Sequence, residues 1–194
     1  EKIGKSAFSG CTGLKAISIP DSVLSIGNTA FYGCTSLEAV SIPDNIVSIG
    51  EKAFFNCELE SITLSKSITE LPSSVFNSCT SLLAINIPDG VTLIRTSAFS
   101  GCTSLKSVVV PDSVAAIEAS VFYGCSALES VALPEALTAI LNSTFYGCIS
   151  LSEFTIGENV TSIGISAFYN CKSLKSIVIP ASVESLGTSI FENC

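Results

Sequence analysis

The fold of this chain is decided by one stretch, Ala98-Phe99-Ser100-Gly101-Cys102-Thr103-Ser104-Leu105-Lys106-Ser107-Val108-Val109-Val110-Pro111. Similar stretches recur at 30–43, where the sequence reads AFYGCTSLEAVSIP, and at 167–180, where it reads AFYNCKSLKSIVIP. A fixed period predicts a solenoid, in which each repeat buries its apolar side chains only against its neighbours.

The period of the repeat is marked by cysteine, at positions 11, 34, 57, 79, 102, 125, 148, 171 and 194. Every interval is 23 residues except one of 22, because Cys57-Glu58-Leu59 lacks one residue between Cys and Leu. Phe stands three residues before every Cys, and Leu follows in each of the eight repeats that continue. The repeat therefore runs through all 194 residues without a linker.

The full unit reads L-x-x-I-x-I-P-D-x-V-x-x-I-G-x-S-A-F-x-G-C-x-x, and this pattern resembles the leucine-rich repeats of the BspA-like class. The resemblance covers the whole chain. It implies a right-handed, curved leucine-rich-repeat solenoid with a parallel β-sheet on its concave face and short extended or helical turns on its convex face. Members of the class are typically surface or secreted proteins of mucosal bacteria and protozoan parasites, so the resemblance implies adhesion and host contact.

The residue pattern divides each unit into three parts. Residues 14–19 alternate apolar and small side chains with β-branched types, which predicts a strand that Pro20 ends. Eight such strands in parallel register, ~4.8 Å apart, would form a sheet roughly 35–40 Å long. Residues 23–26 predict a second, short extended segment. We expect irregularities at the third repeat, where Ser65-Lys66 replaces Pro-Asp, and at the seventh, where Gly157 replaces Pro.

The third part predicts a single helical turn before each cysteine. Ser or Thr stands five residues before Cys in eight of nine repeats, as at Ser6 and Thr29, and this suits a helix N-cap. The residue directly before Cys is Gly or Asn in eight of nine repeats, which suits the left-handed backbone at a helix end. The side chains expected in the core of one coil are Leu105, Val108, Val110, Val114, Ile117, Val121, Phe122 and Cys125.

Composition and charge exclude several classes of function. The net charge is −8, and the nine Lys and Arg are spread along the chain, so no basic stripe can neutralise nucleic-acid phosphates or attract an anionic membrane. The longest apolar runs span a few residues, far below the ~20 that cross a bilayer. The chain has no His, so a cysteine nucleophile would lack its usual base, and we expect no catalytic residue, cofactor or metal ion.

The cysteine column has three interpretations. We favour small buried side chains that pack in a column. Disulfides between stacked coils are the rival, although side chains in a ladder point parallel to each other and nine is an odd number. A zinc site is the least favoured interpretation, because the Cys ligands of zinc usually come as pairs close in sequence, and this chain has no such pair.

Two further columns carry polar or aromatic side chains. An acidic column stands directly after the first strand, and we interpret it and its Ser or Asn neighbours as turn residues that bind backbone, with a calcium site as the alternative. An aromatic column two residues before Cys either shields the Phe column beneath it or anchors a partner. The acidic column consists of Asp21, Asp44, Asp89, Asp112, Glu135 and Glu158. The aromatic column consists of Tyr32, Phe55, Tyr123, Tyr146 and Tyr169.

A partner site is predicted along one edge of the first strand. In each of the eight repeats, two exposed positions flank the first Ile of Ile-x-Ile, as Ala16 and Ser18 do, and we call these sixteen positions the floor. Most of them carry small side chains, and only Glu153 is charged. The residue just before each floor pair forms the edge, and its side chain varies in charge and size from repeat to repeat. Recognition of a specific partner requires such variation. We therefore expect a protein partner along this edge and the floor beside it, at Lys15, Glu38, Glu60, Leu83, Lys106, Glu129, Ser152, Glu153 and Lys175.

The sequence as a whole predicts one leucine-rich-repeat domain over residues 1–194, with about eight repeats, as part of a longer chain. The predicted function is a non-enzymatic protein-binding or adhesion module of a cell-surface or secreted protein, which contacts a host or matrix protein. The alternative is a structural spacer that presents another domain. A catalytic domain outside this segment is a more distant third.

Overall fold

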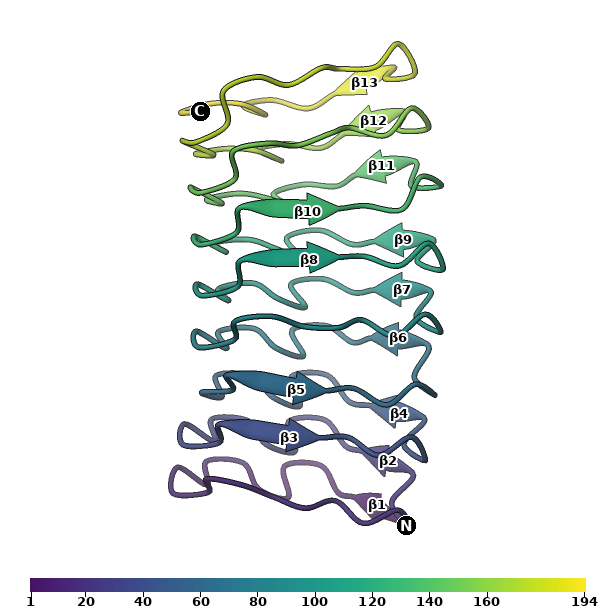
Figure 1. The fold of residues 1–194 in the computed structure, drawn as a ribbon, viewed down its shortest axis with the longest axis vertical. Helices are drawn as coiled ribbons and strands as arrows, with labels where there is room; N and C mark the ends of the chain where they lie inside the picture. The colour runs from purple at the N-terminus through teal and green to yellow at the C-terminus, as the bar shows by residue number, and fades with distance from the viewer.

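The computed structural model describes all 194 residues, which wind into a stack of coils with parallel strands and no helix (Figure 1). Each coil passes once along two faces of the stack and returns through a turn segment that contains Phe and Cys. The thirteen strands are short: β1 Lys2–Ile3, β2 Ser25–Ile26, β3 Ala39–Ser41, β4 Ser48–Ile49, β5 Ser61–Thr63, β6 Glu70–Leu71, β7 Leu93–Ile94, β8 Ser107–Val109, β9 Ala116–Ile117, β10 Ser130–Ala132, β11 Ala139–Ile140, β12 Ser162–Ile163 and β13 Ser185–Leu186.

The strands lie on two faces of the solenoid. On the first face, built by the Leu-x-x-Ile-x-Ile segments, β3 pairs with β5 and β8 pairs with β10. On the second face, the predicted short extended segments form three sheets of three strands, β1-β2-β4, β6-β7-β9 and β11-β12-β13. All pairs are parallel and in the register of the repeat, as in Ile94 opposite Ile117.

From the second coil onward, consecutive coils pair on one of the two faces only. The second face loses its pairing between β4 and β6 and between β9 and β11, and the first face forms its two pairs across those same coils. One cause of the first break is chemical. Pro72 follows β6 where Arg95 follows β7, and the Arg95 N–H donates to the Leu71 carbonyl at 2.9 Å, whereas proline has no N–H to donate.

The prediction of one continuous eight-stranded sheet on the first face is therefore wrong. The spacing of the buried Phe rings offers the physical reason. Consecutive rings stack with centroids 5.2–5.8 Å apart, which is wider than the ~4.8 Å between hydrogen-bonded strands. Both faces pair together only between the first and second coils, through the Ala16–Ala39 bridge and β2–β4, where the Phe31 and Phe54 rings are 5.2 Å apart. The later coils, whose rings are 5.3–5.8 Å apart, pair on one face only.

The core follows the sequence prediction. Every side chain expected inside the fifth coil, from Leu105 to Cys125, is buried, and the apolar columns of all coils merge into one cluster of 52 residues. Seven phenylalanines, from Phe31 to Phe168, have no exposed surface, and they form the continuous spine described above. This spine is the largest apolar element shared by every coil, so we infer that it sets the stacking distance.

The predicted helical turn before each cysteine is wrong. The residue five before Cys has a φ of 53–59° in every repeat, and Gly, Asn or Ser78 directly before Cys has a φ of 54–74°, whereas a helix needs about −63° throughout. Around Phe99, the N–H groups of Ala98 and Cys102 bind the carbonyls three residues back, which closes two separate turns with Ser97 and Gly101 in their third positions. A positive φ there is typical of type II turns.

The turn segments also join consecutive coils. Between the bonds that close the turns, alternate N–H groups donate to the following coil, as from Phe99 to the Val121 carbonyl at 3.0 Å and from Gly101 to Tyr123 at 2.7 Å. The N–H groups of the turn segment thus alternate: one binds a carbonyl of its own coil, and the next binds a carbonyl of the following coil. The left-handed residues supply this alternation, which a helix could not make, because a helix directs all its N–H groups along one axis.

Candidate functional site

The predicted partner edge is a continuous exposed ladder on the first face. Its backbone is linked from coil to coil between Lys15 and Ser152, as by the Glu60 N–H to the Glu38 carbonyl and the Glu129 N–H to the Lys106 carbonyl, both at 2.8 Å. All predicted residues of the site are exposed: Lys15, Glu38, Glu60, Leu83, Lys106, Glu129, Ser152, Glu153 and Lys175. All of these residues except Glu153 lie in one row along the edge. Glu153 lies one position further along the chain, on the floor. None of them forms an ion pair, so their charges are available to a partner.

The floor beside this edge is less uniform than its sequence suggested. Most of its side chains are Ala, Ser or Thr, but Val109 and Val178 are 70% and 79% exposed. Leu83 on the edge is also exposed. Apolar side chains of this kind give a partner surface to bury, which a floor of Ala and Ser alone would not.

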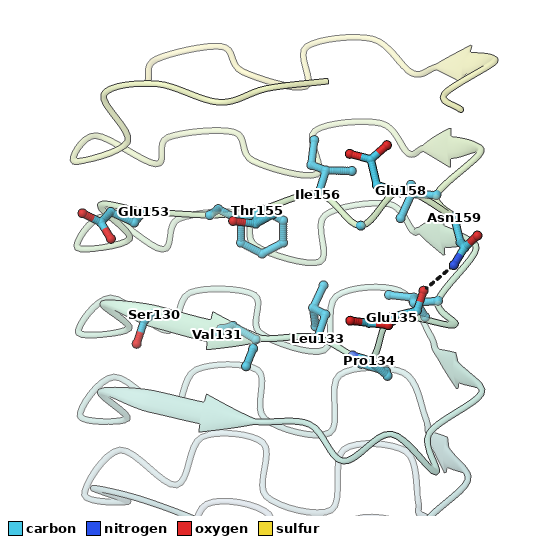
Figure 2. A pocket seen from close by; sticks show the side chains of 15 residues that line it. Ser130, Val131, Leu133, Pro134, Glu135, Glu153, Thr155, Ile156, Glu158 and Asn159 are labelled. Carbon is cyan, nitrogen blue, oxygen red and sulfur yellow. Dashed lines mark hydrogen bonds between the residues drawn. The ribbon is translucent and has the colours of Figure 1, made fainter. Parts of the chain in front are cut away.

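A cleft of about 660 Å³ opens on the first face between the sixth and seventh coils (Figure 2). Residues 130–135 line one side and residues 153–160 line the other. Phe154 explains the separation of the two coils, because the other seven coils place Val or Ile at this position. Its ring packs edge-on between Phe145 and Phe168, with centroids 4.9 and 4.8 Å away. Gly157, which replaces the usual proline, leaves further space.

The cleft is apolar along its length and acidic at its ends. Val131 and Leu133 supply apolar lining from one coil, with Phe154 and Ile156 from the next. Figure 2 shows Glu153 at one end and Glu135 and Glu158 at the other. No Lys or Arg lines the cleft. The sequence analysis identified Gly157 and the two turn glutamates, but it missed Phe154, which is the one aromatic residue in its column and could have been noticed for that reason.

In the acidic turn column only the Asp44 side chain binds backbone, and it binds the neighbouring coil, as do the Asn45 and Asn159 side chains beside the column. The Asp44 carboxylate accepts the Lys66 N–H at 2.9 Å, and the Asn45 amide donates to the Asp21 carbonyl at 2.8 Å. The sequence predicts side-chain-to-backbone bonds here, but these bonds join neighbouring coils and do not close the turn of their own coil. No group of three or more His, Cys, Asp or Glu side chains gathers where it could hold a metal ion.

The aromatic column forms two stacks on the surface. Tyr32 stacks on Phe55, and Tyr123, Tyr146 and Tyr169 form a second stack with centroids 4.7 Å apart. Rings at this distance cover each other's faces, so a partner can reach mainly their edges. The column therefore offers little planar surface, and it is a weaker binding candidate than the first face.

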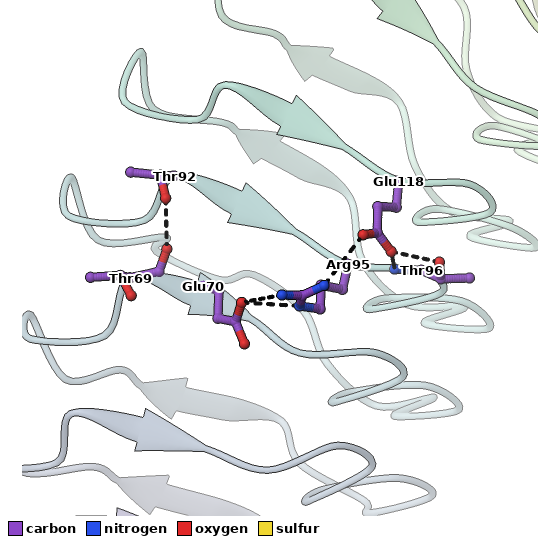
Figure 3. Close-up of polar contacts among 6 residues, drawn as sticks. All are labelled: Thr69, Glu70, Thr92, Arg95, Thr96 and Glu118. Atoms are coloured by element: carbon purple, nitrogen blue, oxygen red, sulfur yellow. Dashed lines mark hydrogen bonds and ion pairs between the residues drawn. The ribbon is translucent and has the colours of Figure 1, made fainter.

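The single arginine lies in an ionic group on the second face (Figure 3). Arg95 binds Glu70 at 2.8 Å and lies 3.6 Å from Glu118, so it links three consecutive coils. The hydrogen bond to Glu70 raises the pKa of Arg95, and bonds from the Thr96 hydroxyl and N–H lower the pKa of Glu118. These partly exposed groups already satisfy each other, which indicates a structural role.

Comparison with known families identifies the repeat. The model of the BspA type leucine-rich repeat region, which spans six copies of the repeat, matches residues 1–94 and 79–194. The chain belongs to this family. The BspA-type repeats thus account for the whole chain, and the resemblance noted in the sequence is confirmed.

Solved structures support the same assignment. A leucine-rich repeat protein of T. pallidum is 32% identical, with a TM-score of 0.81 over 90% of this chain and 83% of that one. A leucine-rich cell surface protein from Faecalibacterium prausnitzii is 27% identical, with a TM-score of 0.58 over 100% of this chain and 80% of that one.

The Pneumococcal vaccine antigen PcpA is 20% identical, with a TM-score of 0.64 over 100% of this chain and 58% of that one, and it shares the fold alone. Comparison with curated proteins gives no match. No helix of this BspA-type protein is long and apolar enough to cross a membrane.

Proposed function

We propose that this BspA-type repeat domain is a protein-binding module of a cell-surface or secreted protein, and that it adheres to a host or matrix protein through its first face. One observation carries the proposal. The exposed edge of that face changes sign and size from Lys15 to Lys175 while the Leu, Phe and Cys columns of the core stay constant. Such variation on a fixed scaffold gives a partner a specific pattern to match.

The edge suits recognition by charge. Rim charges act mainly on the rate of association and on its salt dependence, and they select against partners whose charges do not match. Exposed apolar side chains such as Val109 and Val178 lie on the adjoining floor, where a bound partner would cover them. The proposed partner is therefore a folded protein or an extended segment with both charged and apolar contacts.

The alternative from a different class is a spacer that holds another domain at a distance. The absence of Tyr, Trp and Arg from the floor favours it, because these residues usually dominate the energy of an interface. An enzyme is not proposed, since the chain has no His and seven of its nine cysteines are buried in the core. Binding to nucleic acid is not proposed either, given the net charge of −8.

The test is a binding screen against immobilised matrix and serum proteins, with the purified chain as analyte. The proposal predicts saturable binding to at least one protein, weakened by the double reversal Lys106→Glu/Glu129→Lys. A spacer predicts no saturable binding to any of them, and it would remain functional when whole repeats are deleted.

A further inference from the structure

At the cleft between the sixth and seventh coils, one backbone hydrogen bond is missing that two of the other six pairs of coils make on the first face. The N–H of Val110 donates to the Ala132 carbonyl at 2.9 Å, and Ile42 donates to Thr63 in the same way. One coil later, Leu133 holds the same position as Val110, but its N–H makes no backbone hydrogen bond. The corresponding acceptor, the Thr155 carbonyl, is also without a backbone donor.

Other unpaired coils on this face do not make an equivalent site. Between the fourth and fifth coils the opening is about 370 Å³, and it is lined by Asp89 and residues 109–113. It has no aromatic lining. The larger cleft combines free backbone groups, an apolar wall that includes Phe154, and carboxylates at both ends.

The charges at the two ends are unopposed. Glu135, Glu153 and Glu158 are exposed, and none of them lies in an ion pair. From Glu153 to Glu158 an extended chain would span about 17 Å, at roughly 3.3 Å per residue. An extended ligand of five residues would therefore reach both ends with the side chains of its terminal residues.

We propose that this cleft binds an extended peptide segment with a basic residue at each end and an apolar residue between them. Alternate residues of an extended chain point to the same side, so residues one, three and five would face the cleft. The basic side chains meet the carboxylates, the central apolar side chain lies against Leu133 and Phe154, and the peptide backbone pairs with the Leu133 N–H and the Thr155 carbonyl. Peptide recognition through free strand edges is a common mode.

This inference rests on the proposed function, because it states the chemistry of a partner for the same face. The probe is the blocked peptide Arg-Ser-Leu-Ser-Arg, titrated into the isotope-labelled chain while backbone amide shifts are followed by NMR. We expect saturable shifts concentrated at residues 130–136 and 153–159, with slower amide exchange at Leu133. The peptide Glu-Ser-Leu-Ser-Glu should cause none of these changes.

Three variants sharpen the test. Glu135→Gln with Glu158→Gln should weaken peptide binding at least threefold, about the effect expected for exposed charge pairs. Gly157→Leu should fill the cleft and abolish binding, and there is room for it, because an added Cβ meets only the Val160 side chain at 4.0 Å. Glu184→Gln, an exposed glutamate on the second face, is the matched control and should leave binding unchanged.

The outcomes separate this inference from the proposed function. Shifts confined to the row containing Lys106 and Glu129 would overturn the cleft inference and leave the proposed function standing. Equal binding of the acidic and basic peptides, or no saturable shift with the basic one, would also overturn the cleft inference. A failed screen against matrix proteins with intact peptide binding in the cleft would instead count against the edge as the contact site.

Discussion

The thiol of Cys102 donates a hydrogen bond to the carbonyl oxygen of Phe76, with 3.2 Å between sulfur and oxygen. The same carbonyl lies where the Cys79 N–H closes its own turn, so one oxygen accepts from two coils. Eight cysteines, from Cys34 to Cys194, repeat this bond with sulfur–oxygen distances of 3.0–3.2 Å. Cysteine is therefore both a small core side chain and a donor that links coils, and all nine thiols are free.

Burial predicts how these thiols react. Seven are buried, Cys11 is half-buried and Cys194 is exposed. In the native chain a thiol reagent should label Cys194 and then Cys11, and the other seven should react only slowly. Nine thiols should titrate in denaturant. Rapid labelling of more than two, or fewer than nine in denaturant, would contradict the arrangement.

Stability should fall at alkaline pH. Burial raises the pKa of Cys79, Cys125 and Cys171 from 9.0 to about 12. Above pH 9 the unfolded chain loses these protons first, so the free energy of unfolding should fall by about 1.4 kcal/mol per pH unit for each thiol until the folded pKa is reached. Below pH 8 the thiols should have little effect.

Urea unfolding between pH 7 and pH 11 measures this dependence. Cys125→Ala should lower stability at every pH. It should also make the decrease of the free energy of unfolding with pH less steep, by the contribution of one thiol. An unfolding midpoint that stays constant up to pH 11 would show that the thiols remain protonated in both states or are equally exposed in both.

The phenylalanine spine should dominate the stability of each coil. Phe99→Ala removes a fully buried ring from between two stacked neighbours, and we expect a loss of about 3–5 kcal/mol. Tyr123→Ala removes a ring that is 41% exposed and should cost clearly less. Chemical denaturation of both variants gives the comparison, and equal losses would mean that the spine has no special role.

The turn segments respond to glycine in a way that distinguishes turns from helices. Ser120 has a φ of 59°, and its side chain makes no hydrogen bond, so Ser120→Gly should stabilise the chain by up to about 1 kcal/mol. At a helix N-cap the same change would cost a few tenths of a kcal/mol. Ser107→Gly in β8 is the control, and it should destabilise the chain.

The sequence predicts the core of this solenoid well, because each buried column repeats the same residue types at the same spacing. It could not predict the turn conformation, since Ser before Ala-Phe is compatible with both an N-cap and a left-handed turn residue. Strand pairing also escaped it, because pairing depends on the spacing of Phe rings several residues away. The cleft arises from Phe154 and Gly157 together. In the sequence each is only a single substitution, Phe for the usual Val or Ile and Gly for the usual Pro.

The most direct test of the proposed function is to exchange two charges on the exposed edge. In the variant Lys106→Glu/Glu129→Lys the net charge is unchanged and both residues are exposed, so folding should be unaffected. Association with a protein from the screen should slow about tenfold near 0.05 M salt, and the difference should shrink near 0.5 M, where charges are strongly screened. The matched control is Lys172→Glu/Glu192→Lys, away from the first face. Equal association rates for both variants and the parent chain at both salt concentrations would contradict binding at this edge.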